Sequence, residues 1–188
     1  MAKIKENYSD HNMELPSVKY RDHISIFLLF LWGIATCLFY GRIGFMPLDQ
    51  SVVFDGAWRI ISGQVPFRDF NTPNSISPIL LQALFFKLFG VNWFVYCLHA
   101  AIFNAIFCLL VFFSLRLLGG SRLVSFFYAF LSSLIFYPPF SVPCPDQHAF
   151  FFVILALVVA IFASTSQALS AKVLCWVLLP AIMVAAYF

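Results

Sequence analysis

The residues of this chain whose types could do chemistry are carboxylates placed close to long apolar runs. The polar segment 49–78 holds three of the eight acidic residues, Asp49, Asp55 and Asp69, and a later polar segment holds Asp146. A charge beside a bilayer is costly unless it has a partner or a function. Such a carboxylate could act as a general base toward a hydroxyl group, or it could cap a helix.

Both roles are open for Asp49 and Asp146. Asp49 follows the apolar turn 44–48 after the first apolar run, and Asp146 stands just before the fourth run. Each acid is therefore at the expected start of a helix, where a carboxylate stabilises the first turn. His148, two residues after Asp146, makes an incomplete metal site with it. We therefore predict no metal ligands and interpret His148 as an interfacial residue.

The other two acids of the first polar segment have arginines close by in the sequence. Arg59 follows Asp55 by four residues, and Arg68 directly precedes Asp69. The simplest expectation for both acids is an ion pair with the neighbouring arginine in a solvated loop.

The composition identifies the class of protein. Of 188 residues, 62% are hydrophobic, only 10% are charged and 25 are Phe. The surface of a water-soluble domain of this size would need far more charge. The chain is therefore expected to be an all-α, multi-pass membrane protein. A formal net charge of +3 does not indicate a nucleic-acid partner, and the five cysteines show no paired spacing.

Apolar runs of near-spanning length predict about five membrane spans. They cover residues 24–40, 93–115, 123–137, 149–163 and 173–188. The cations of the preceding tail and of two links are Lys3, Lys5, Lys19, Arg21, Arg116, Arg122 and Lys172. The positive-inside rule puts these segments in the cytoplasm. The tail 1–23 is then inside, and loops 41–92 and 137–148 are outside.

Short helices are expected within the first outer loop. Residues 48–62 have an amphipathic pattern that Gly63 would end. The apolar run 79–89 is too short to cross the bilayer, so we place it in the interface, with Lys87 reaching the headgroups. Within the second span, His99 and Asn104 are best explained by hydrogen bonds to neighbouring helices.

The first outer loop also resembles that of a known enzyme family. In order along the chain it has Asp49, the helix end AWRI with Gly63, the turn PFRDF over 66–70, a Pro-bearing patch, and LFFKLFG over 84–90. This order is similar to the first periplasmic loop of GT-C glycosyltransferases, the membrane enzymes related to protein O-mannosyltransferases and lipid A aminoarabinose transferases.

This resemblance implies transfer of a sugar from a polyprenyl-phosphate donor to a glycan, lipid or protein acceptor outside the cytoplasm, in a bacterial inner membrane. It assigns Asp49 and Asp146 to catalysis. The chemistry requires a carboxylate that activates or orients the acceptor and cations or a divalent metal that offset the phosphate charge. Arg59 and Arg68 are the candidate phosphate partners.

Two features depart from the family. Gln50 stands where relatives often have Glu after the first acid, and relatives usually run to several hundred residues. We therefore expect residues 24–188 to be the amino-terminal module of a longer enzyme. The alternative is a non-enzymatic small membrane protein, such as a transport or assembly subunit, that uses the same loops to bind a partner.

Overall fold

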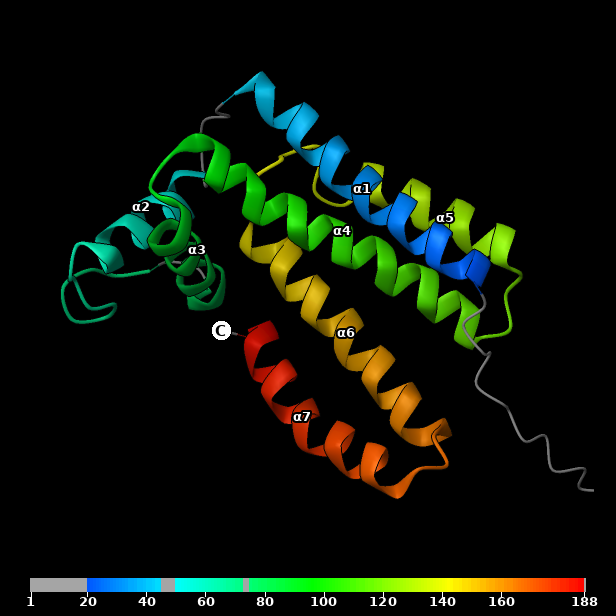
Figure 1. The fold of residues 1–188 in the computed structure, drawn as a ribbon. Coiled ribbons are helices and arrows are strands. Elements are labelled where there is room, and N and C mark those ends of the chain that lie inside the picture. Colours follow the sequence, from blue (N-terminus) through cyan, green and yellow to red (C-terminus); the bar gives the residue numbers. More distant parts are fainter. Residues whose placement is uncertain (1–19, 45–49, 73–74, 188) are drawn as a thin grey trace, which may run out of the picture.

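The protein is an all-α membrane protein. Its computed structural model describes residues 20–44, 50–72 and 75–187, and in this part of the chain the helices follow one another without a strand (Figure 1). The helices are α1 (Tyr20–Tyr40), the 3-10 turn η1 (Gly41–Ile43), α2 (Gln50–Ile61), α3 (Ile76–Phe89), α4 (Trp93–Leu117), α5 (Arg122–Ile135), α6 (Pro145–Thr165) and α7 (Leu169–Tyr187). Within the described residues, α1, α4, α6 and α7 are long and apolar enough to cross a membrane.

The central layer is formed by α1, α4 and α5, which pack side by side along their lengths (Figure 1). Small residues allow α1 and α4 to approach each other closely. A Cβ atom on Gly33 of α1 would lie 2.7 Å from the Cα atom of Ala105 in α4. Asn104 ties all three helices together, because its Nδ2 donates to the carbonyl oxygens of Gly33 at 2.9 Å and Ser133 of α5 at 3.0 Å. The expected interhelical role of Asn104 is confirmed.

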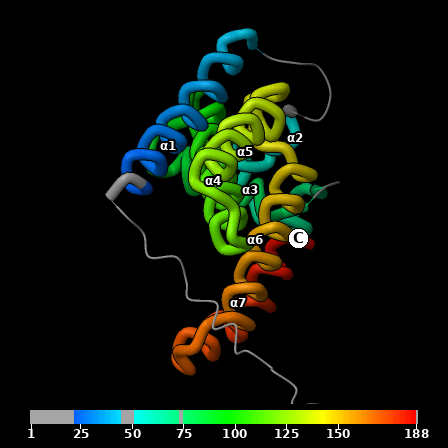
Figure 2. The backbone as a smooth tube through the Cα atoms, turned by 90° about the vertical axis from the view of Figure 1, so that its right-hand side faces the viewer, coloured from blue at the N-terminus to red at the C-terminus, as the bar shows by residue number. Residues whose placement is uncertain are grey.

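The hairpin α6–α7 extends the bundle on one side. Helix α7 packs on α6, lies apart from α1 and α5 (Figure 2), and has no buried residue among those described. Its far end is tied to the α3 helix, since the Ser77 hydroxyl donates to the Ala185 carbonyl at 3.0 Å. The open apolar surface of α7 is compatible with contact with lipid tails.

Helix α5 is shorter than the run that predicted it. It has 14 residues, which rise only about 21 Å. The predicted span 123–137 ends instead in a folded loop that begins at Phe136, the C-cap residue, whose backbone N–H donates a hydrogen bond to the Ser132 carbonyl. The proline-containing loop 136–144 follows the α5 helix.

Candidate functional site

The segment after Asp49 forms a lobe of two helices at the end of the bundle where α1 finishes and α4 begins (Figure 1). Val53 and Ala57 of α2 pack with Ile79, Ala83 and Phe86 of α3, and all five are buried. Helix α2 is amphipathic, as the sequence predicted, and it stops at Gly63, which has φ of +91°. Only glycine adopts this backbone region without strain.

The turn between the two helices is held by Asp69. Its Oδ2 accepts from the Val65 amide at 2.8 Å, and Arg68 donates to both carboxylate oxygens through Nε and Nη2 at 2.9 and 2.8 Å. Phe67 has a left-handed φ of +64° and donates its amide to the Phe70 carbonyl at 2.8 Å. Arg68 and the Val65 amide hold the pKa of the Asp69 carboxyl below its usual range.

Arg59 is also paired with an acid. Its Nε donates to Asp55 Oδ2 at 2.7 Å, Nη1 lies 3.4 Å from Gln64 Oε1, and the guanidinium lies 5.7 Å from the centre of the Phe70 ring. The ion pairs expected for Asp55 and Asp69 are confirmed. Each arginine nevertheless keeps N–H groups that its acid does not use, because a guanidinium carries five donors. Phosphate binding by Arg59 and Arg68 stays a prediction.

Of the two predicted catalytic acids, only Asp146 lies in the described part of the chain. Asp49 lies outside the described residues, immediately before α2. Asp146 is exposed and lies in the first turn of α6, after the N-cap residue Cys144, whose side chain makes no capping hydrogen bond. This position suits a carboxylate, since the amino end of a helix favours negative charge.

The loop before Asp146 is folded back on itself. The Tyr137 carbonyl accepts from the amides of Phe140 and Ser141, the Ser141 hydroxyl donates to the Pro138 carbonyl at 2.8 Å, and Gln147 Nε2 donates to the Phe136 carbonyl at 3.2 Å. These bonds give the backbone before α6 a fixed path, which in turn fixes the start of the helix that carries Asp146.

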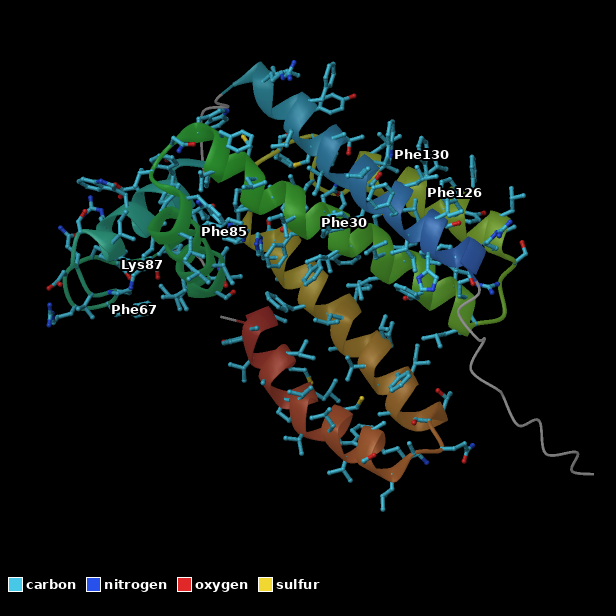
Figure 3. The ribbon with its side chains drawn as sticks, in the orientation of Figure 1. Phe30, Phe67, Phe85, Lys87, Phe126 and Phe130 are labelled. Atoms are coloured by element: carbon cyan, nitrogen blue, oxygen red, sulfur yellow. The ribbon has the colours of Figure 1, made fainter. Side chains whose placement is uncertain are left out.

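A buried chain of four polar side chains links this loop to the α2–α3 lobe. Tyr137 Oη lies 2.7 Å from His148 Nδ1, His148 Nε2 lies 3.0 Å from His99 Nε2, and His99 Nδ1 lies 2.9 Å from Gln82 Oε1. All four residues are fully buried. The chain passes from the loop between α5 and α6 through α6 and α4 to α3, and Phe85 of α3 stacks on the His99 ring at 4.7 Å (Figure 3).

Burial raises the pKa of Tyr137 well above its usual range, so the phenol keeps its proton. If the phenol donates to His148 Nδ1, His148 donates from Nε2 to His99 Nε2, and His99 donates from Nδ1 to Gln82 Oε1. Both imidazoles are neutral in this arrangement. The Gln82 Nε2 amide is buried without a partner among the described groups.

The interfacial interpretation of His148 is therefore wrong. The sequence places His148 two residues from a charged loop residue, but its ring points inward from α6 and is sealed by Tyr137, His99 and Phe103. The expected interhelical hydrogen bond of His99 is confirmed, with Gln82 as its partner. The sequence could have indicated Gln82 as a buried polar partner, because it is the one side-chain amide within the apolar run 76–86.

The lobe also carries a cavity of about 290 Å³, lined by Ser51, Phe54, Asp55 and Trp58 of α2 and by Val91 before α4. In this cavity the exposed Trp58 ring and the Asp55 carboxylate lie on the same face of α2. Within residues 20–44, 50–72 and 75–187, no three His, Cys, Asp or Glu side chains are placed to hold a metal ion. None of the described cysteines forms a disulfide.

Compared with protein-family models, curated proteins and solved structures, the chain matches none of them.

Proposed function

We propose that this chain is a glycosyltransferase module of the GT-C type, which transfers a sugar from a polyprenyl-phosphate donor to an acceptor hydroxyl at the membrane face that carries α2 and α3. The observation that carries the proposal is the buried chain Tyr137–His148–His99–Gln82. It joins the lobe that begins after Asp49 to the loop that precedes the helix of Asp146. Two acids from distant parts of the sequence would need such a connection to serve one site.

In the proposed reaction, the acceptor oxygen attacks the anomeric carbon of the donor sugar. The bond from that carbon to the phosphate oxygen breaks, and the polyprenyl phosphate leaves with the bonding electrons. Asp49 takes the acceptor proton as general base. Asp146 orients the acceptor or sugar hydroxyls by accepting hydrogen bonds from them.

Arg59 and Arg68 are proposed to bind the phosphate. Each would use N–H donors that its acid leaves free, because guanidinium groups bind phosphate through paired N–H bonds. Among the described residues no ligand cluster suits a divalent metal, so no step is assigned to a metal. The arginines would offset the charge of the leaving phosphate.

The location follows from the charge pattern. Cations in residues 1–21, at the facing ends of α4 and α5, and in the first turn of α7 favour the cytoplasm for those segments. The proposed site is then on the outer face of a bacterial inner membrane. The competing proposal, a transport or assembly subunit, would use the same lobe to bind a protein and would not need Asp49 as a base.

The test is sugar transfer by the intact protein in membranes with the Asp49→Asn variant. Asn removes the charge but caps a helix about as well as Asp. A general base predicts a loss of about a hundredfold or more, while a capping residue predicts little change. Asp55→Asn, whose carboxylate pairs with Arg59 in an exposed position, is the control. Near-normal transfer by Asp49→Asn, or equal losses in both variants, would contradict the proposal.

A further inference from the structure

A second cavity lies at the opposite end of the bundle from the α2–α3 lobe. It has a volume of about 370 Å³ and lies between the first turns of α1 and α5, which pack against each other. Its lining residues are Ile24, Ser25, Leu28, Arg122, Leu123 and Phe126. Both helices begin at the same end of the bundle (Figures 1 and 2), so this cavity is at the level where a membrane protein meets lipid headgroups.

The lining combines one cation with an apolar wall. Leu123, Leu28 and Ile24 are 77%, 50% and 49% exposed, so the wall opens outward from the bundle. Phe126 extends from α5 beside α1 and continues the wall (Figure 3). A small water-soluble anion would not bury the apolar wall, and a hydrocarbon chain alone would not pair with the cation. The combination fits an amphiphile with a negative headgroup.

The cation is available for such a headgroup. Arg122 is half-buried and forms no ion pair with any acid in the described ranges, where the pairs are Arg59 with Asp55 and Arg68 with Asp69. The nearby Arg116 is engaged, because its Nη1 donates to the Gly120 carbonyl at 2.8 Å. Charge complementarity at this site therefore depends on Arg122.

We infer that this cavity binds one anionic glycerophospholipid of the adjoining leaflet. The Arg122 guanidinium donates to the lipid phosphate, and an acyl chain lies along Leu28 and Phe126. Basic pockets between membrane helices on the cytoplasmic side are suited to anionic headgroups. The inference does not depend on the proposed glycosyltransferase activity.

The test is lipid retention by the full chain in detergent, measured by native mass spectrometry with added phosphatidylglycerol or phosphatidylcholine. We expect one retained phosphatidylglycerol and weaker retention of phosphatidylcholine. Arg122→Gln should lower phosphatidylglycerol retention about fivefold or more. Leu28→Trp, which fills the cavity and leaves the charge in place, should lower it as well.

The control is Arg42→Gln, because Arg42 is an exposed cation at the other end of α1, in η1. It should leave retention unchanged. Equal retention of both lipids by the unmodified chain would overturn the inference, as would equal losses with Arg42→Gln and Arg122→Gln. Arg122→Lys should keep most retention, which separates loss of charge from failure to fold. Stronger retention of an added polyprenyl phosphate than of phosphatidylglycerol would also contradict the assignment.

Discussion

At the scale of single residues, Tyr137 determines how the buried polar chain is arranged. When its hydroxyl donates to His148 Nδ1, every later donor in the chain follows from it. Without that hydroxyl, the tautomer with the His148 proton on Nδ1, donated to the Cys144 carbonyl 3.1 Å away, is favoured. His148 Nε2 would then lack a proton to give His99, so the His99 ring and the Gln82 amide would both have to reverse.

We therefore expect Tyr137→Phe to destabilise the protein by about 1–3 kcal/mol, the usual penalty for a buried polar group that loses its partner. The measurement is thermal unfolding of the purified protein in detergent. Tyr128→Phe is the matched control, because Tyr128 is 57% exposed on α5. A Tyr137→Phe protein as stable as the control would show that the hydroxyl does not order the chain.

The charge state of Asp69 is predicted to depend on Arg68. Because the folded pKa of Asp69 is lowered, its carboxylate contributes to the turn above the ordinary aspartate pKa, and the contribution is lost as pH falls through the lowered value. Arg68→Gln should raise the titration midpoint of the Asp69 carboxyl, measured by NMR of labelled protein. Arg59→Gln should leave it unchanged. An unaltered midpoint in Arg68→Gln would mean that Arg68 is not the main cause.

At the scale of the helices, the contact between α1 and α4 depends on a small residue. Gly33 allows the two backbones to meet and also supplies the carbonyl that Asn104 binds. In an isolated helix, Gly→Ala is favourable by about 1 kcal/mol. Here the added methyl would stand 2.7 Å from the Ala105 Cα atom, so the helices must separate.

Gly33→Ala is accordingly expected to lower stability by about 1–3 kcal/mol, as for other overpacked sites. Thermal unfolding in detergent measures the change. Ala35→Leu adds bulk to the exposed face of the same helix and should have little effect. Stability equal to or above that of the original protein in Gly33→Ala would contradict the close packing of α1 on α4.

The sequence predicted the helices better than their contacts. Apolar runs and helix stops identify α2, α3 and the four long helices. Both signals depend on neighbouring residues in the sequence, since lipid favours a continuous apolar run and a glycine ends the helix that it follows. The end of α5 was harder to predict, since Phe136 and Tyr137 are as apolar as the helix they follow. They belong to the next loop, where Phe136 stacks on Phe107 of α4 and Tyr137 contacts His148 of α6. Periodicity does not distinguish a buried loop aromatic from the last turn of a span.

At the scale of the whole molecule, the sequence suggested which loops share a face but not what joins them. The acids and arginines were visible as charges near apolar runs, and their ion pairs followed from short spacing. The histidine contact was not visible, because His99 and His148 lie 49 positions apart and meet only through the packing of α4 on α6. Long-range pairing of this kind is a property of the fold and not of a local pattern.

The central claim is that the α2–α3 lobe and the loop before α6 build one site. Its most direct test is cross-linking of Asp49→Cys to Asp146→Cys in a chain whose five native cysteines have been replaced. A bifunctional maleimide of about 10–12 Å reach would suit carboxylates that share one sugar phosphate. Asp49→Cys with Ser121→Cys, at the opposite end of the bundle, is the control pair. We predict an intramolecular cross-link for the first pair alone; complete labelling of both cysteines without a cross-link would contradict the claim.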